Sequence, residues 1–133
     1  MAATESPVTE PAETDVISLT IPAAMRFVRL VRIGASSIAR RKGLPVRAID
    51  SLRLAVDESF GLLLNEADHE GSIDVTFEVD DHELIVLAQQ RITNGPIPVA
   101  EEDLIRFDVL MTDLVARFEA DPETGVVQFS FPF

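Results

Sequence analysis

Two adjacent carboxylates, Asp57 and Glu58, lie in an apolar stretch that runs from Arg53 to Asn65. Carboxylates are a frequent source of acid–base chemistry, and helical spacing predicts where these two point. The predicted core-facing stripe of this helix holds Ile49, Leu52, Val56, Phe60, Leu63 and Ala67. A second face holds Ser51, Leu54, Ala55, Glu58, Leu62, Asn65 and His69. Because this face mixes leucines with a carboxylate, we expect it either to pack beneath another element or to line a pocket.

The preceding part of the chain supplies elements that must position this helix. Residues 16–21 alternate and favour a strand, which Pro22 ends. Residues 24–42 then follow a helical pattern, and Pro45 can open the carboxylate helix, which we expect to end near Asp68. The predicted buried stripe of the first helix is Phe27, Leu30, Val31, Gly34, Ala35 and Ile38. Its arginines and Ser36 are expected to face elsewhere.

The rest of the chain predicts a sheet. Residues 72–79 and 83–89 form a hairpin around a turn at 80–82, a helix runs from residue 101 to about 118, and a last strand covers 126–131. This order predicts an α/β (α+β) two-layer sandwich, in which three helices cover one face of a mixed, mostly antiparallel sheet. Residues 16–133 are expected to form one domain, and residues 1–15 a disordered acidic tail.

The segment Leu-Arg-Leu-Ala-Val-Asp-Glu, from Leu52 to Glu58, resembles the N-box helix of the GHKL ATPases, most closely their anti-sigma factor and serine-protein kinase branch. The resemblance implies that Glu58 polarises a water or hydroxyl group, and that an Asn one turn later holds Mg²⁺ on the ATP phosphates. Here Leu62 occupies the position one turn after Glu58, and leucine has no oxygen ligand for Mg²⁺. Asn65 lies on nearly the same face but about 4.5 Å further along the axis.

The other nucleotide motifs of that family are degenerate. Where the resemblance implies Asp-x-Gly-x-Gly, the chain reads Gln-Gln-Arg-Ile-Thr-Asn-Gly-Pro, so only Gly95 remains, and a simple turn explains it equally well. Where a Gly-x-Gly phosphate cradle is implied, Glu101, Glu102 and Asp103 would repel a triphosphate. We therefore expect no cofactor; if ATP or ADP with magnesium does bind, Asn65 and Gly95 are the candidate contacts.

Basic residues are concentrated between Pro22 and Arg53, where 8 of the 11 lysines and arginines lie and Asp50 is the only acid. One interpretation is that they form the solvated face of an amphipathic helix. The alternative is a protein-binding surface made by Arg26, Arg29, Arg32 and Arg40, because arginine is enriched at interfaces and suits carboxylate recognition. The resemblance implies that the first helix as a whole contributes to sigma-factor docking and to a homodimer.

Composition argues against several function classes. The net charge of −12 argues against direct nucleic-acid binding, since phosphate contacts need basic residues. The chain has no cysteine and no apolar run long enough to span a membrane, so we expect a cytoplasmic protein. The two histidines, His69 and His82, lie beside predicted turns and lack the further ligands of a metal site.

Three functional hypotheses follow. The favoured one is an anti-sigma-factor-like regulator that sequesters a sigma factor, is countered by an anti-anti-sigma (STAS-type) protein, and has weak or lost ATP binding. The second is an active ATP-dependent serine-protein kinase of the same family, with Glu58 as base and Asn65 or a water at the metal. The third is a non-catalytic binding module of unrelated role, in which Asp57 and Glu58 only solvate a helix.

Overall fold

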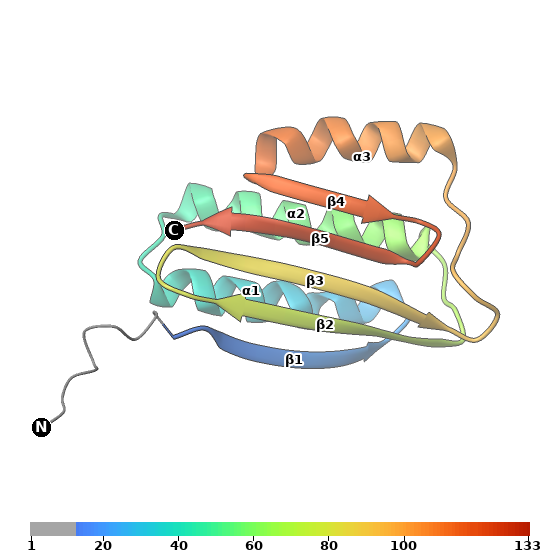
Figure 1. Ribbon diagram of the computed structural model, residues 1–133, viewed down its shortest axis with the longest axis horizontal. Coiled ribbons are helices and arrows are strands. Elements are labelled where there is room, and N and C mark those ends of the chain that lie inside the picture. Colours follow the sequence, from blue (N-terminus) through green and yellow to red (C-terminus); the bar gives the residue numbers. More distant parts are fainter. Residues whose placement is uncertain (1–12) are drawn as a thin grey trace, which may run out of the picture.

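A computed structural model describes residues 13–133 and shows a sheet with helices on one face (Figure 1). The elements are β1 (Asp15–Pro22), the short 3-10 helix η2 (Met25–Phe27), α1 (Val28–Arg41), α2 (Val46–Leu64), β2 (Gly71–Val79), β3 (Glu83–Ile92), α3 (Glu101–Leu114), β4 (Arg117–Asp121) and β5 (Val126–Pro132). Within these residues the strand order is β1-β2-β3-β5-β4, and every pairing is antiparallel. The predicted two-layer class is confirmed, with a wholly antiparallel rather than a mixed sheet.

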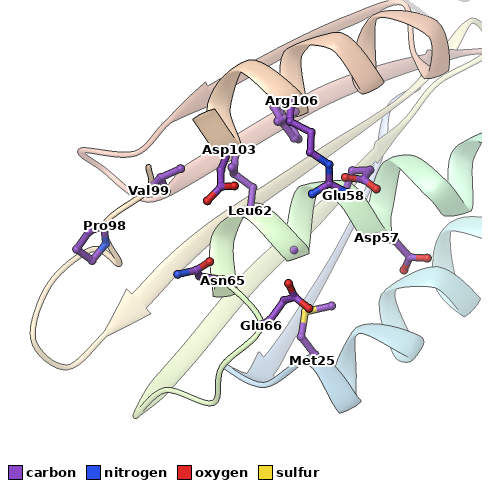
Figure 2. A pocket seen from close by; sticks show the side chains of 12 residues that line it. Met25, Asp57, Glu58, Leu62, Asn65, Glu66, Pro98, Val99, Asp103 and Arg106 are labelled. Carbon is purple, nitrogen blue, oxygen red and sulfur yellow. The ribbon is translucent and has the colours of Figure 1, made fainter. Parts of the chain in front are cut away.

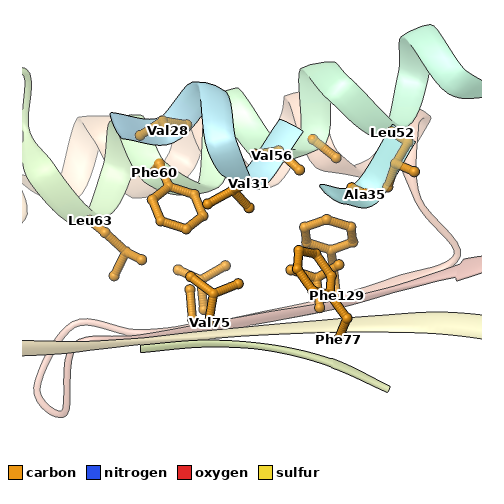
Figure 3. Packing of buried hydrophobic residues seen from close by; sticks show 14 of the residues in the cluster. Val28, Val31, Ala35, Leu52, Val56, Phe60, Leu63, Val75, Phe77 and Phe129 are labelled. Atoms are coloured by element: carbon orange, nitrogen blue, oxygen red, sulfur yellow. The ribbon is translucent and has the colours of Figure 1, made fainter. Parts of the chain in front are cut away.

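The core lies between the sheet and the helices α1 and α2 (Figure 3). Strand β2 alternates as predicted, and its register places Phe77 opposite Val86, which in turn lies opposite Phe129. The α2 side chain of Phe60 is fully buried above these strands. Helix α1 packs so closely on the sheet that a Cβ added at Gly34 would lie 3.4 Å from the Phe77 ring. This packing fixes the position of α2.

The ends of two helices differ from the prediction. Helix α2 ends at Leu64 instead of near Asp68, because Asn65 adopts a left-handed conformation (φ 49°) and Ala67 is consequently exposed outside the helix. Helix α3 ends at Leu114, and the residues from Arg117 to Asp121 form the unpredicted edge strand β4. The apolar spacing around Phe118 had suggested a longer helix. Instead, the Phe118 ring packs edge-to-face on Phe107, 5.8 Å away.

The stripe predicted for the first helix is also shifted. Leu30 is 49% exposed, whereas Ser36 is buried. Helix α1 starts only at Val28, after the tighter turns of η2, which changes the angle at which its residues meet the sheet. The predicted tail lies outside the described residues except for residues 13–15, and Asp15 already begins β1. Among residues 13–133, no helix is both long enough and apolar enough to cross a membrane.

Candidate functional site

A pocket of about 260 Å³ lies between α2 and α3 (Figure 2). It is lined by Met25, Asp57, Glu58, Gly61, Leu62, Asn65, Glu66, Pro98, Val99, Asp103, Arg106 and Phe107. The expectation that the carboxylate face of α2 either packs beneath an element or lines a pocket is confirmed for Glu58, Leu62 and Asn65, which all border it. It is wrong for Leu54, which is 51% exposed, and Ala55 belongs to the core instead. Helix α3 covers this face of α2 and closes the opposite wall.

Glu58 is half-buried in this pocket, and Arg106 extends from α3 toward it (Figure 2). Leu62, one turn after Glu58, places an apolar side chain on the same wall. The neighbouring Asp57 turns away toward α1, where its Oδ1 accepts a hydrogen bond from Arg32 Nη1 at 2.5 Å. The adjacent carboxylates therefore have different roles: Glu58 is available to the pocket, and Asp57 holds an ion pair.

The structure brings Asn65 and Glu58 to one pocket but separates Gly95 from them. Asn65 is the C-terminal cap of α2, and its backbone N–H donates to the Gly61 carbonyl at 2.9 Å. Gly95 occupies a turn at positive φ (87°) after β3 and borders a different hollow with Thr93 and Thr124. The residues expected to contact one nucleotide thus lie at two sites.

The charge of the pocket is unfavourable for a polyphosphate. Within the described residues four carboxylates border it, those of Asp57, Glu58, Glu66 and Asp103, against the single guanidinium of Arg106. Asp103 belongs to the first turn of α3, which carries no glycine and three consecutive acids. No group of three or more His, Cys, Asp or Glu with metal-site geometry occurs within residues 13–133. Among residues 13–133 the pocket has one candidate base, Glu58, but its one cationic side chain, Arg106, cannot match the charge of several phosphate groups.

Sequence reasoning missed two residues that shape this region. One is Arg106, which comes from a distant helix. The other is Gln90, whose buried Nε2 donates to the Leu63 carbonyl at 2.6 Å while its Oε1 accepts from the Ile97 N–H at 3.2 Å. Gln90 therefore ties the end of α2 to the segment before α3. The sequence does contain a pattern that predicts a buried Gln90, because alternation along β3 places it on the same face as buried Val86 and Ala88.

A second hollow, of about 500 Å³, lies beside α1 and is called the arginine groove below. It is lined by Arg29, Arg32, Ile33, Ser36, Ser37, Arg40, Arg41 and Arg53. Within residues 13–133 only Arg32 of its five arginines has an acidic partner within 4.0 Å. The buried Ser36 Oγ has no hydrogen-bond partner among the described residues. Three of the four predicted partner-binding arginines therefore meet in one groove.

The fourth, Arg26, is held elsewhere. Its Nη1 donates to Asp68 Oδ2 at 3.0 Å, and its guanidinium carbon lies 4.8 Å from the centre of the Phe27 ring. Both contacts are local to the junction between η2 and the end of α2. The structure thus divides the predicted basic surface into a groove and one separate side chain.

No protein family profile matches the chain. It is similar to the serine-protein kinase RsbW of Halalkalibacterium halodurans, with 32% identity over 131 residues that cover 86% of this chain and 81% of that protein. It is also similar to RsbW of Listeria monocytogenes serovar 1/2a, with 29% identity over 98 residues that cover 71% of this chain and 62% of that protein. The chain thus spans about three fifths of the length of the Listeria relative.

Proposed function

The chain belongs to the family of the serine-protein kinase RsbW, and from that premise we propose that it acts by binding protein partners, with little or no use of ATP. In this proposal it sequesters a sigma factor in the cytoplasm until an anti-anti-sigma (STAS-type) protein displaces it. Its relatives are named as kinases, so the proposal rests on how this chain's own pocket differs from what phosphate transfer needs.

The observation that carries the proposal is the composition of the pocket at Glu58. Leu62 stands where a magnesium ligand would be needed, and the first turn of α3 directs Asp103 at the space a phosphate would enter. A triphosphate would therefore meet an apolar side chain at the position of the magnesium ligand, and carboxylates where the resemblance implies glycine backbone. Arg106 alone offers compensating charge.

The arginine groove supports protein binding as the main activity. Four of its guanidinium groups have no acidic partner among residues 13–133, although the chain carries a net charge of −12. Unpaired arginines on a strongly acidic protein suit the bidentate recognition of carboxylates on another protein. The groove also includes exposed Ile33, which would lose solvent contact beneath a partner.

Thermal unfolding with and without millimolar Mg-ATP or Mg-ADP tests the nucleotide part of this proposal. A ligand present at about 100 times its dissociation constant stabilises a fold by about 2.7 kcal/mol, which shifts the melting temperature of a domain this size by several degrees. We expect no shift. A reproducible shift with either nucleotide would contradict the proposed loss of ATP binding.

Capture of partners from the native cytosol tests the binding part. The wild-type chain should retain a sigma factor, and Arg29→Glu combined with Arg40→Glu should abolish retention because both reversals fall in the arginine groove. Arg47→Glu is the matched control, since Arg47 is exposed on α2 but does not line the groove. Equal loss in the control, or no sigma factor with the wild type, would count against the proposal.

The resemblance also implies a homodimer through the first helix, and we include it in the proposal. Sedimentation of the purified chain should give twice the monomer mass. A monomeric mass at micromolar concentration would remove this part and leave the binding surface of α1 fully available to partners.

A second candidate, an active serine-protein kinase, draws on one specific observation: Glu58, Asn65 and Arg106 border the same pocket. A base, an amide and a guanidinium are the side-chain types that phosphate transfer to a serine could use. This candidate requires transfer of labelled phosphate to the partner and its loss in Glu58→Gln. Absence of transfer to the captured partner would exclude it.

A further inference from the structure

A third groove, of about 380 Å³, lies between α3 and the edge strand β4. It shares only Phe107 with the pocket and no lining residue with the arginine groove. Its apolar lining includes Leu104, Ile105, Val109, Phe118 and Ala120. Ile105 is 59% exposed and Val109 is 63% exposed, and they lie one helical turn apart on the same face of α3. Large apolar side chains that gather over a groove usually mark a binding surface.

One wall of this groove is the end of the sheet. Strand β4 lies at the edge of the sheet and pairs only with β5 in the described part of the chain. Among residues 13–133, one side of its backbone therefore has no neighbouring strand, and α3 runs along that side across the groove (Figure 1). Exposed edge backbone can pair with an extended segment of another protein. The groove offers such a segment both backbone hydrogen bonds and apolar contacts.

The negative charge around the groove favours a basic partner. Within residues 13–133 the charged residues that line it are all acidic: Glu101, Asp108 and Glu119. The neighbouring basic residue of β4, Arg117, is already engaged, since its Nη2 donates to Glu83 Oε1 at 2.8 Å. A second copy of this chain placed edge to edge would bring carboxylates against carboxylates. A basic partner would instead be attracted.

Side-chain alternation along β4 predicts which positions of an added strand should be apolar and which should be basic. Phe118 lies opposite Phe129 and Ala120 opposite Val127, so both face the helix side, whereas Glu119 and Asp121 face the outer side of the sheet. A strand added to β4 would therefore direct alternate residues toward Ile105 and Val109. The residues between them would lie beside Glu119 and Asp121, where lysine or arginine is favoured.

We propose that an extended segment of a partner protein, with alternating apolar and basic side chains, adds to the sheet along β4 and fills the groove beneath α3. This inference goes beyond the proposed function, because it uses a surface that neither nucleotide nor the arginine groove involves. It gives the chain a second, oppositely charged docking site. A basic segment and an acidic segment can then bind at the same time.

The test uses a synthetic peptide of about seven residues that alternates valine and lysine, long enough to cover a five-residue strand. Titration followed by amide NMR should shift the resonances of β4 and of the exposed face of α3. A peptide with glutamate in place of lysine should bind at least about tenfold more weakly. A valine–lysine peptide with N-methylated backbone should also bind about tenfold more weakly, because it cannot complete the backbone ladder.

Variants of the groove separate the proposal from general attraction to an acidic protein. Val109→Lys and Glu119→Lys change exposed side chains and should each weaken peptide binding about tenfold while the melting temperature stays near that of the wild type. Leu54→Lys is the matched control on α2, where Leu54 is 51% exposed and lines none of the three grooves. It should bind like the wild type.

Several results would overturn the proposal. Equal binding of the N-methylated peptide, with shifts confined to α3, would indicate a helical or non-specific occupant. Equal weakening by Leu54→Lys would show that net charge alone is being measured. Absence of any binding by the valine–lysine peptide, or dimerisation of the chain through β4, would each exclude the proposed occupant.

Discussion

The two sides of α2 carry opposite charges although one helix forms a wall of both. On the side of α3, Glu58 and Glu66 face a pocket with one guanidinium, Arg106. On the side of α1, Arg53 joins four arginines of α1 in a groove that is lined by no carboxylate among residues 13–133. The pocket to which the resemblance assigns the phosphates is therefore the less favourable of the two places for an anion, on the charges of its lining residues. The arginine groove, on the other side of the helix, has the more favourable charge.

The boundary between the two regions is the ion pair of Arg32 and Asp57. Arg32 belongs to the arginine groove and Asp57 borders the pocket, and their side chains are 29% and 40% exposed. This pair neutralises one charge on each side. The remaining charges are the other arginines on the side of the groove and Glu58, Glu66 and Asp103 on the side of the pocket. Substitution of these residues can therefore test how far the two regions differ.

The largest effect should come from removing the packing that supports both regions. Phe60 is fully buried, so Phe60→Ala should lower the free energy of unfolding by about 3–5 kcal/mol and disrupt pocket and groove together. Urea unfolding measures the loss. Leu54→Ala, at a 51% exposed position of the same helix, should change stability by less than about 0.5 kcal/mol. If Phe60→Ala lowered the free energy of unfolding no more than Leu54→Ala does, then the packing of α2 would not support the two regions.

The fold was largely predictable because short-range periodicity reflects burial. Alternation located β2 and β3, and helical spacing placed Leu52, Val56 and Phe60 in the core, where they are fully buried. The strand β4 was not predicted because Leu114, Val115 and Phe118 continue the helical spacing of the apolar residues before them. Pairing with β5 places Phe118 in a strand instead. Local sequence contains no information about such a pairing.

The site was predictable only in part. The position of Glu58 on a half-buried face follows from α2 alone, and the pocket confirms it. Arg106 and Asp103 reach the same pocket from α3, and their arrival depends on how α3 packs against α2. The arginine groove was anticipated as a charged segment, but Arg26 leaves it for Asp68, a contact between residues far apart in the chain.

The next largest effect should be a gain of nucleotide binding in a variant of the pocket. Leu62→Asn supplies an amide one turn after Glu58, and Asp103→Gly removes a carboxylate from the entrance of α3. The double variant should gain up to about 2.7 kcal/mol of stability with Mg-ATP at about 100 times its dissociation constant, seen as a melting shift of several degrees. The wild type should show none.

Leu54→Asn is the control for that experiment, because it adds an amide to α2 outside the pocket. A shift in the control would indicate binding elsewhere on the chain. If the double variant also stays unresponsive, then side-chain chemistry at these two positions is insufficient, and the shape of the segment before α3 must exclude nucleotide.

A smaller effect should come from the boundary pair itself. Arg32→Ala and Asp57→Asn, with their double variant, form a cycle whose coupling we expect to be about 0.2–1 kcal/mol, because both side chains remain partly exposed. Chemical unfolding at low and high salt measures it, and salt should reduce the coupling. A coupling that salt leaves unchanged would mean that packing rather than charge joins the two regions.

The smallest effect lies away from both regions, on the outer face of the sheet, and shows what an isolated acid–base contact contributes. The pKa of Asp74 is lowered from its ordinary value of 3.8, first by the hydrogen bond from Arg91 Nε and then by the one from Thr20 Oγ1 at 2.9 Å. Because the folded-state pKa lies below the unfolded one, this carboxylate stabilises the fold at pH values above 3.8. The contribution is lost as the pH falls through the lowered folded-state pKa.

Asp74→Asn should therefore unfold at a lower urea concentration than the wild type near neutral pH, and the difference should vanish at the acid end of a titration. Arg91→Gln removes the main cause of the lowered pKa and should shrink the same acid-dependent difference while the contact with Thr20 remains. Neither variant should alter binding at the arginine groove, because both positions alternate with the buried residues of β2 and β3 and so lie on the opposite face of the sheet from α1. A binding change in either would show that charge acts across the sheet, and the contrast between the two sides of α2 would then reflect the field of the whole chain instead of local arrangement.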